Sequence, residues 1–230
     1  MPELRVVQDG LWCVDHRDFS VGGLALGTRT TLVRRPGGGL ACFSPGPLTP
    51  AHLGEIRAVG EVTDVVIPNQ LHNLFTENAA AAFPSAKVYA VASIRRKRPA
   101  LRIDEELGDR VPAALADTFD MLPLDGARVV DERVFFHPPS KTALGVDVAF
   151  NIRNATGFFR FAMWLNDAND KLCMTRLGKA QYLDDHAAAA RSVDRICDAW
   201  DFDRLVVSHG EVYEGGAREA LREAYGFGRA

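Results

Sequence analysis

The order of predicted secondary-structure elements indicates an α/β sandwich. Short apolar runs at 62–67, 87–91 and 205–207 are typical of buried strands, and segments of helical periodicity separate them. Hairpins are inserted into this alternation, which favours a sandwich over a plain doubly wound sheet. Because the sequence shows no repeats and no low-complexity linker, we expect one domain over residues 1–230.

The first third of the chain predicts antiparallel strands followed by a helix. A short strand is expected at 11–15, and the glycine-rich turn RPGGG predicts a hairpin that joins strands at 30–34 and 40–43. A helix then follows the loop SPGPLTP. Its expected N-cap is Thr49, with Pro50 in the first helical position and Gly60 as the stop.

The remaining elements are predicted by caps, breakers and apolar runs. Asn69 is expected to cap a helix that runs to about Ala82, where Pro84 ends it. No regular pattern is evident at 93–124 or at 151–180. We expect a hairpin around HPPSK and helices near the C-terminus, with these ranges: strands at 129–136 and 142–148, helices at 182–200 and 215–225.

Composition and charge restrict the classes of partner. The chain has 230 residues, of which 47% are hydrophobic and 25% are charged, and its net charge is -3. These values favour neither nucleic acid nor an anionic membrane as a partner. A small-molecule substrate or ligand is expected instead from the site residues considered below. MPELRVVQDG lacks a signal-like apolar segment, so we expect a cytoplasmic protein with four reduced cysteines. The sequence does not predict an oligomeric state.

Several stretches together resemble a known family. They are SPGPLTP at 44–50, PNQLHNLF at 68–75, AFPSAKVYA at 82–90, VFFHPPSKTALGVDVAFN at 134–151 and WDFDRLVVSHGEVYEGG at 200–216. On these stretches the chain resembles a family of uncharacterised bacterial and plant proteins that is similar to the metallo-β-lactamase-like fold. The resemblance implies an αββα sandwich whose site lies at strand ends on one edge, and it implies no particular reaction.

The metal motif of that superfamily is degenerate in this chain. Active members carry HxHxDH after the strand that corresponds to 63–67, and its four ligand positions fall near Asn69, Leu71, Asn73 and Leu74. None of these side chains is a histidine or a carboxylate, the donors that a zinc site of this kind needs. The resembling family instead shows a histidine at the place of His72. That residue is either a ligand or a partly buried histidine in a helical first turn.

Two further donors follow apolar strands. Asp147 comes after the run 143–146, where the resemblance implies a bridging aspartate; a carboxylate that only caps backbone amides is the alternative. His209 stands in SHG after 205–207, where the resemblance implies a metal-binding histidine and Gly210 permits a sharp turn. His137 lies in the HPPSK turn at the other end of its strand, so we expect it on the opposite edge.

We therefore predict a cleft formed by His72, Asp147 and His209, with Asn69 and Asn73 as hydrogen-bond donors that line it. Two histidines and one carboxylate suit one Zn or Fe ion with open positions. Three functions remain open. They are a mononuclear metallohydrolase acting on an ester, thioester or phosphoester, a metal-free pseudoenzyme that binds a metabolite or protein, and acid–base chemistry by Asp147 and His209.

The other polar candidates have simpler interpretations. We expect His16 and His52 on the surface, and His186 at a helix start capped by the acidic residues before it. RRKRP at 95–99 is short and is followed by IDEELGD, which favours a solvated helix end. Ser44 has no base near it in the sequence, so the sequence alone does not indicate a nucleophile.

Overall fold

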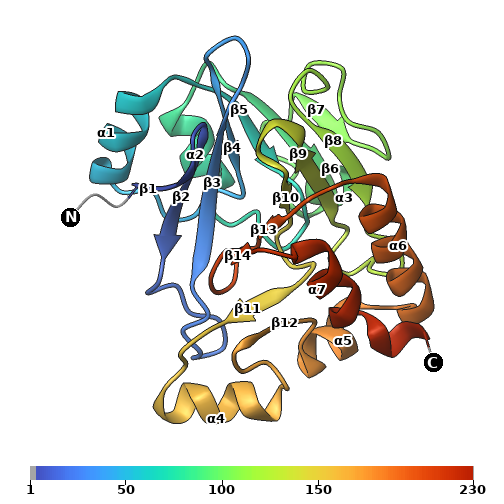
Figure 1. Ribbon diagram of the computed structural model, residues 1–230. Helices are drawn as coiled ribbons and strands as arrows, with labels where there is room; N and C mark the ends of the chain where they lie inside the picture. Colours follow the sequence, from blue (N-terminus) through green and yellow to red (C-terminus); the bar gives the residue numbers. More distant parts are fainter. Residues whose placement is uncertain (1–3, 230) are drawn as a thin grey trace.

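The computed structural model describes residues 4–229, and its first sheet has seven strands in sequence order. The strands are β1 (Leu4–Gln8), β2 (Leu11–His16), β3 (Thr28–Arg34), β4 (Leu40–Phe43), β5 (Val62–Ile67), β6 (Lys87–Val91) and β7 (Glu105–Leu107). Pairs from β1 to β4 are antiparallel, whereas pairs from β4 to β7 are parallel. The first half of the chain therefore forms one complete sheet (Figure 1).

The second sheet has five strands in the order β14-β13-β10-β9-β8, and a separate two-stranded ladder joins β11 to β12. The bounds are β8 (Asp120–Pro123), β9 (Arg133–His137), β10 (Thr142–Leu144), β11 (Phe150–Ile152), β12 (Lys171–Cys173), β13 (Arg204–Val206) and β14 (Tyr213–Glu214). Strand β10 is parallel to β13 and antiparallel to β9. The carboxyl ends of β10 and β13 thus meet at one edge.

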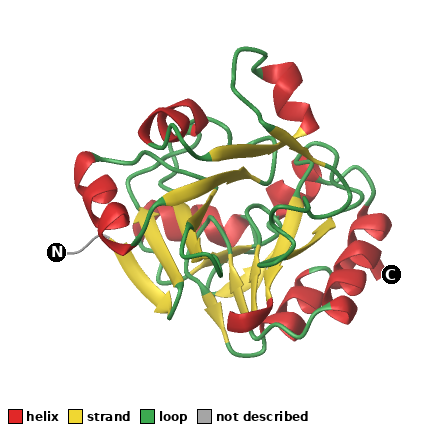
Figure 2. Cartoon of the chain, turned by 90° about the horizontal axis from the view of Figure 1, so that it is seen from above, coloured by secondary structure: helices red, strands yellow, loops and turns green. Residues whose placement is uncertain are grey.

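Helices cover the outer faces of both sheets, as the view from above shows (Figure 2). They are α1 (Pro50–Val59), α2 (Thr76–Ala82), α3 (Ala92–Lys97), α4 (Gly157–Leu165), α5 (Arg176–Tyr182), α6 (His186–Ala199) and α7 (Ala217–Ala224), with 3₁₀ turns at Pro138–Ser140 and Gly226–Arg229. Helices α1, α2 and α3 contact the seven-stranded sheet, and α7 contacts β13. Helix α6 joins the same apolar cluster as β13.

The two sheets pack face to face through aromatic side chains. The ring of Phe43 on β4 lies 5.1 Å from the ring of Phe135 on β9 and 5.1 Å from that of Phe119, between centroids. Leu144 and Val206 of the second sheet belong to the same buried cluster as the first sheet. This is the predicted αββα sandwich, with the 30–43 hairpin and the 205–207 strand in different sheets.

Several predicted boundaries are confirmed and others are wrong. Thr49 caps α1, Pro50 begins it and Gly60 follows its end, as predicted. The helix expected from Asn69 begins only at Thr76. Four further expectations change as follows: the strand at 129–136 begins at Arg133, that at 142–148 ends at Leu144, the helix at 182–200 begins at His186, and regular elements occur within 93–124 and 151–180.

Two further expectations are confirmed. His137 pairs with Thr142 at the start of β10, whereas Asp147 follows the other end of that strand, so the HPPSK turn lies at the opposite edge. All four cysteines are free. The helices of residues 4–229 are too short or too polar to traverse a bilayer.

Candidate metal centre

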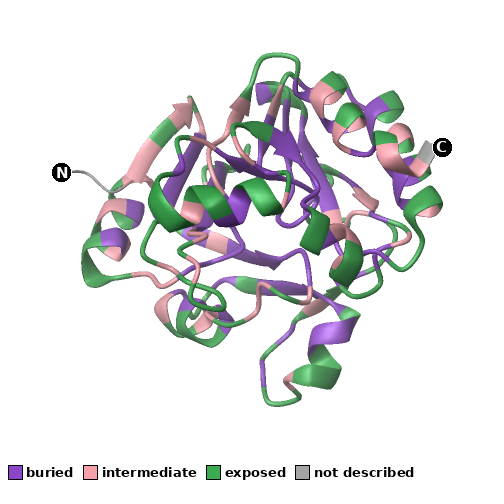
Figure 3. Cartoon of the chain, turned by 90° about the horizontal axis from the view of Figure 1, so that it is seen from below, coloured by how far each residue is buried: buried purple, intermediate pink, exposed green. Residues whose placement is uncertain are grey.

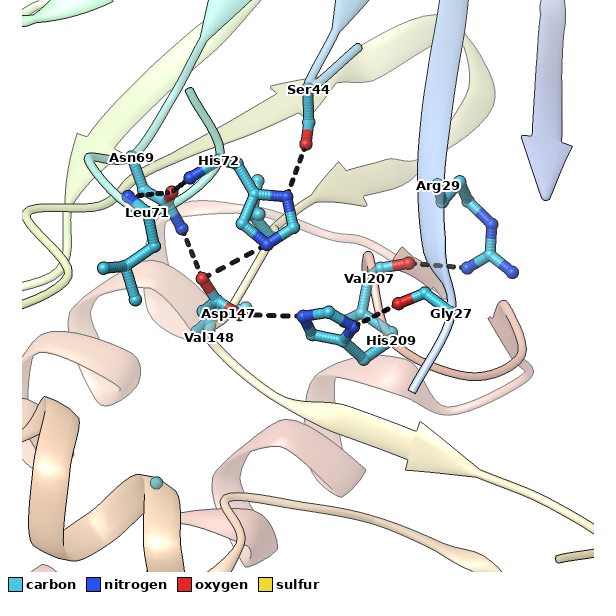
Figure 4. A network of polar contacts seen from close by, with 12 residues as sticks. Gly27, Arg29, Ser44, Asn69, Leu71, His72, Asp147, Val148, Val207 and His209 are labelled. Atoms are coloured by element: carbon cyan, nitrogen blue, oxygen red, sulfur yellow. Dashed lines mark hydrogen bonds and ion pairs between the residues drawn. The ribbon is translucent and has the colours of Figure 1, made fainter. Parts of the chain in front are cut away.

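Three predicted side chains converge at the edge formed by strand carboxyl ends (Figure 4). His72 Nε2 lies 3.5 Å from Asp147 Oδ2, and His209 Nε2 lies 3.3 Å from Asp147 Oδ1. One donor atom from each residue lies within 4.8 Å of the others. The prediction that the three meet is confirmed geometrically, while their chemical role stays a prediction.

Strand topology explains this convergence. Asp147 follows β10 and His209 follows β13. Because these strands are parallel neighbours, the segments that carry the two residues leave the sheet at the same edge. His72 follows β5 of the other sheet. Gly210 has φ +92°, and a Cβ there would lie 2.1 Å from the carbonyl oxygen of Asn151, so only glycine fits the turn after His209.

Both histidines use Nδ1 for a protein contact and direct Nε2 toward Asp147. The carbonyl oxygen of Gly27 lies 2.7 Å from His209 Nδ1, and a carbonyl can only accept a hydrogen bond. His209 therefore carries a proton on Nδ1, and its Nε2 faces Asp147 Oδ1. Ser44 Oγ lies 2.9 Å from His72 Nδ1 in the equivalent position. Metal-binding histidines are oriented in this way by their second nitrogen.

Asp147 is held by a buried carboxylate that the sequence analysis did not single out. Glu132 is 0% exposed and accepts hydrogen bonds from the backbone N–H groups of Val146 at 2.7 Å and Asp147 at 2.8 Å. Burial and the charge of Asp147 raise the pKa of Glu132. Burial alone would raise the pKa of Asp147 too, but His72 and His209 lower it, so Asp147 carries the negative charge.

Arg29 was also missed by the sequence analysis, and it supports the loop that carries His209. Its guanidinium forms an ion pair with Asp15, with Nε 2.6 Å from the carboxylate. It also donates to the carbonyl oxygens of Val207 at 2.5 Å and Gly210 at 2.6 Å. Since these carbonyls flank His209, the buried cation holds its backbone in place.

The two asparagines predicted to line the cleft behave differently. Asn69 Nδ2 donates to Asp147 Oδ2 at 2.7 Å, and its Oδ1 accepts from the backbone N–H groups of Leu71 and His72. Asn69 therefore orients the carboxylate and caps the turn that carries His72. Asn73 instead donates to the carbonyl oxygen of Gln70 and accepts from Arg98, so its side chain does not join the site.

The expectation of surface positions for His16 and His52 is wrong. His16 is 7% exposed and contacts Thr30 Oγ1 at 2.9 Å, and His52 is 8% exposed. His52 completes the cap of α1, because its Nδ1 accepts from the backbone N–H of Thr49 at 3.0 Å. Their rings meet edge to face with centroids 5.3 Å apart, away from the three converging donors.

Comparison with known proteins identifies the fold. No protein-family model and no curated protein matches the chain. The DIM-1 metallo-β-lactamase exposed to ceftazidime matches with 15% identity, 97% coverage of both chains and a TM-score of 0.71. A metallo-β-lactamase from Pontibacter korlensis matches with 13% identity, 97% and 98% coverage and a TM-score of 0.70. The mono-zinc form of FIM-1 from Pseudomonas aeruginosa matches with 12% identity, 96% and 93% coverage and a TM-score of 0.67.

The chain has a metallo-β-lactamase-like fold. Within this fold the three donors fit one metal ion. Two ligands about 2.1 Å from a tetrahedral ion lie roughly 3.4 Å apart, and the two histidine nitrogens lie 3.5 and 3.3 Å from oxygens of Asp147. Three protein ligands with a free fourth position are typical of catalytic zinc sites. Asn69, Leu71, Asn73 and Leu74 add no histidine or carboxylate that could hold a second ion.

A cavity of about 300 Å³ opens at this site, and the three donors His72, Asp147 and His209 lie in its wall. This volume is at the lower end of the range for small-molecule sites. Tyr182, which the sequence analysis did not single out, also lines it, and burial raises the pKa of its phenol to about 12. The phenol is therefore protonated at neutral pH and can donate a hydrogen bond. Ser44 does not line the cavity.

Proposed function

We propose that this chain is a metal-dependent hydrolase with one divalent Zn or Fe ion. His72 and His209 would hold the ion through Nε2, and Asp147 through its carboxylate. One observation carries the proposal: both Nε2 atoms face the same carboxylate, at 3.5 and 3.3 Å. A buried carboxylate is costly to maintain. An ion held between the carboxylate and the two nitrogens would offset that cost.

The protein contributes orientation and charge to this chemistry. When bound, the ion supplies Lewis-acid polarisation of a substrate oxygen. Asn69, which donates to the Asp147 carboxylate, and Glu132, which accepts from the Asp147 backbone N–H, aim that carboxylate at the two histidines. The protonated phenol of Tyr182 is available to donate to the substrate from the cavity wall. The reaction class is hydrolysis of an ester, thioester or phosphoester bond in a small molecule.

Metal analysis tests the proposal. The protein is stripped with a chelator, reloaded with Zn²⁺ or anaerobically with Fe²⁺, and its metal content is measured by mass spectrometry. We expect about one equivalent in the wild type and a loss of at least tenfold in His209→Ala, with an unchanged circular dichroism spectrum. His137→Ala is the matched control, since His137 is similarly buried at the opposite edge, and it should retain the ion.

The competing function is a metal-free binding protein for a metabolite or another protein. One observation favours it: Asp147 already has partners within the chain, since Asn69 donates to Oδ2 and His209 lies at Oδ1. In that case the wild type takes up no ion. His209→Ala then lowers the unfolding free energy, because Asp147 loses a buried partner. This pair of results would contradict the hydrolase.

A further inference from the structure

The cavity beside the three donors has a wall that is mostly apolar. Its apolar side chains come from three segments, one before β3, one after β4 and one that precedes α2, and they are Phe19, Val21, Pro45, Leu71, Leu74 and Phe75. The rings of Phe19 and Phe75 meet edge to face with centroids 5.9 Å apart, so the first and the last of these segments form one continuous surface. This surface leads away from His72, Asp147 and His209.

The part of the cavity wall that the structure describes offers an anionic substrate no cationic side chain. Among the described residues that line the cavity, none is a lysine or an arginine. The buried cation nearest to His209 is Arg29, and its guanidinium already binds Asp15 and two backbone carbonyls. An anionic group that entered the cavity would lose its hydration and would gain no cationic partner beyond the proposed ion from the described residues that line it.

We propose that the cavity binds the apolar acyl group of an uncharged ester or thioester, an inference that rests on the hydrolase function proposed above. The scissile carbonyl lies at the three donors, and the acyl chain lies against Leu71, Leu74 and Phe75. Water adds to that carbonyl, the bond to the alcohol or thiol breaks, and the leaving group takes up a proton. The products are a carboxylic acid and an alcohol or thiol, with no change of oxidation state.

Hydrolysis of three p-nitrophenyl substrates tests the inference with zinc-loaded protein. Each buried methylene adds about fourfold in binding, so kcat/KM for the butyrate ester should exceed that for the acetate ester by at least about tenfold. The phosphate ester should be hydrolysed at least a hundredfold more slowly than the butyrate ester. Equal rates for acetate and butyrate, or a preference for phosphate, would overturn the inference.

A charge placed on the apolar wall provides the matched comparison. Leu74 is 58% exposed and Val6 on β1 is 64% exposed, so lysine is tolerated at both positions without disturbing the core. Leu74→Lys should lower kcat/KM for butyrate at least tenfold with the metal content unchanged, while Val6→Lys should have no effect. A Leu74→Lys enzyme that keeps its preference for butyrate would contradict the proposal.

A binding measurement separates this inference from the hydrolase proposal. The neutral fluorophore N-phenyl-1-naphthylamine is titrated into metal-free protein, where no hydrolysis is needed. We expect saturable binding that weakens at least tenfold in Leu74→Lys. If no ester is hydrolysed but this pattern holds, the hydrolase proposal fails and the apolar cavity stands.

Helix α4 supplies the control for that titration. It lies below the sheets in Figure 1, and the view from below shows exposed residues along it (Figure 3). Phe158, Phe161 and Trp164 are 75%, 52% and 64% exposed. None of them lines the cavity. Binding that is lost in Trp164→Lys but retained in Leu74→Lys would place the apolar site on α4 and overturn the inference.

Discussion

Two serine–histidine pairs stand at opposite edges of the molecule. Ser44 Oγ lies 2.9 Å from His72 Nδ1 at the candidate metal centre, and Ser140 Oγ lies 2.7 Å from His137 Nδ1 in the HPPSK turn. Hydrogen bonds to the second nitrogen of a metal-binding histidine typically contribute 10- to 100-fold to metal affinity. The pair at the metal centre therefore offers a test that the other pair controls.

We expect Ser44→Ala to weaken Zn²⁺ binding by roughly 10- to 100-fold, because the His72 ring loses the contact that orients it. Competition with a chromophoric chelator measures the affinity. Ser140→Ala removes the same type of contact from His137 and should leave the affinity unchanged. Equal effects of the two substitutions would show that Ser44 acts through general stability and not through His72.

His16 couples folding to pH. Burial and the neighbouring His52 lower its pKa to about 4, although Asp15 opposes this, whereas the pKa in the unfolded chain is about 6.5. Between these values the unfolded chain binds more protons, so this contribution to stability is complete above pH 6.5 and is lost as the pH falls toward 4. The loss amounts to at most roughly 3 kcal/mol.

Urea unfolding at pH 7.0, 6.0 and 5.0 measures this dependence. The wild type should become progressively less stable, and His16→Gln should show a smaller decrease over the same interval because the titrating group is gone. Identical pH dependence in both proteins would assign the effect to other groups.

At the scale of single residues, the sequence predicted the three donors better than it predicted the residues that orient them. His72, Asp147 and His209 each follow an apolar strand, and that position is visible in the sequence. Glu132 and Ser44 act across 15 and 28 residues of chain, through contacts that only the folded structure creates. The one available signal for Glu132 was a charged residue directly before the buried strand β9, where an unpaired charge is costly.

Among the elements, α1 has the clearest capping signal. Thr49 Oγ1 accepts from the backbone N–H of His52, and His52 Nδ1 accepts from that of Thr49. Thr49→Ala should therefore lower the unfolding free energy by about 1 kcal/mol in guanidinium titrations. Thr156 precedes α4 but makes no side-chain cap, so Thr156→Ala should cost clearly less. A larger loss for Thr156→Ala would contradict this account.

Two of the elements whose boundaries were wrong, the helix after Asn69 and the strand that ends at Leu144, lie beside the candidate metal centre. The backbone N–H of Gln70 donates to the carbonyl oxygen of Val130 at 2.9 Å, which diverts the chain after Asn69 from a helical path. Strand β10 ends at Leu144 because the N–H groups of Val146, Asp147 and Val148 donate to Glu132 instead of to a neighbouring strand. Long-range contacts override local propensity at both places, and sequence patterns do not contain them.

For the molecule as a whole, the four thiols report on the integrity of both sheets. All are buried, and burial raises the pKa of Cys42 to about 12, of Cys173 to about 11 and of Cys197 to about 12. Since the thiolate is the reactive form, native protein should react with Ellman's reagent at a small fraction of the unfolded rate. Four thiols should be titrated in guanidinium. Fewer than four would reveal a disulfide.

The overall architecture was predictable because its evidence is spread along the chain. Hairpins among βα units indicated a sandwich. The stretches that resemble a known family, which occur in the expected order along the chain, indicated the metallo-β-lactamase-like type. The packing of Phe43 on Phe135 between the sheets was not predictable, because it joins strands 92 residues apart whose facing sides no local pattern identifies. With identities of 12–15% to the solved structures, the fold is retained although few residues are shared.

The two sheets use consecutive parts of the chain, strands between residues 4 and 107 in one and between 120 and 214 in the other. His72 belongs to the first part, and Asp147 and His209 belong to the second. A nascent chain on the ribosome can thus complete its first sheet while it still lacks two of the three donors. A product that stops before His209 lacks one of the three donors, so the full donor set for the proposed ion exists only after His209 has been synthesised.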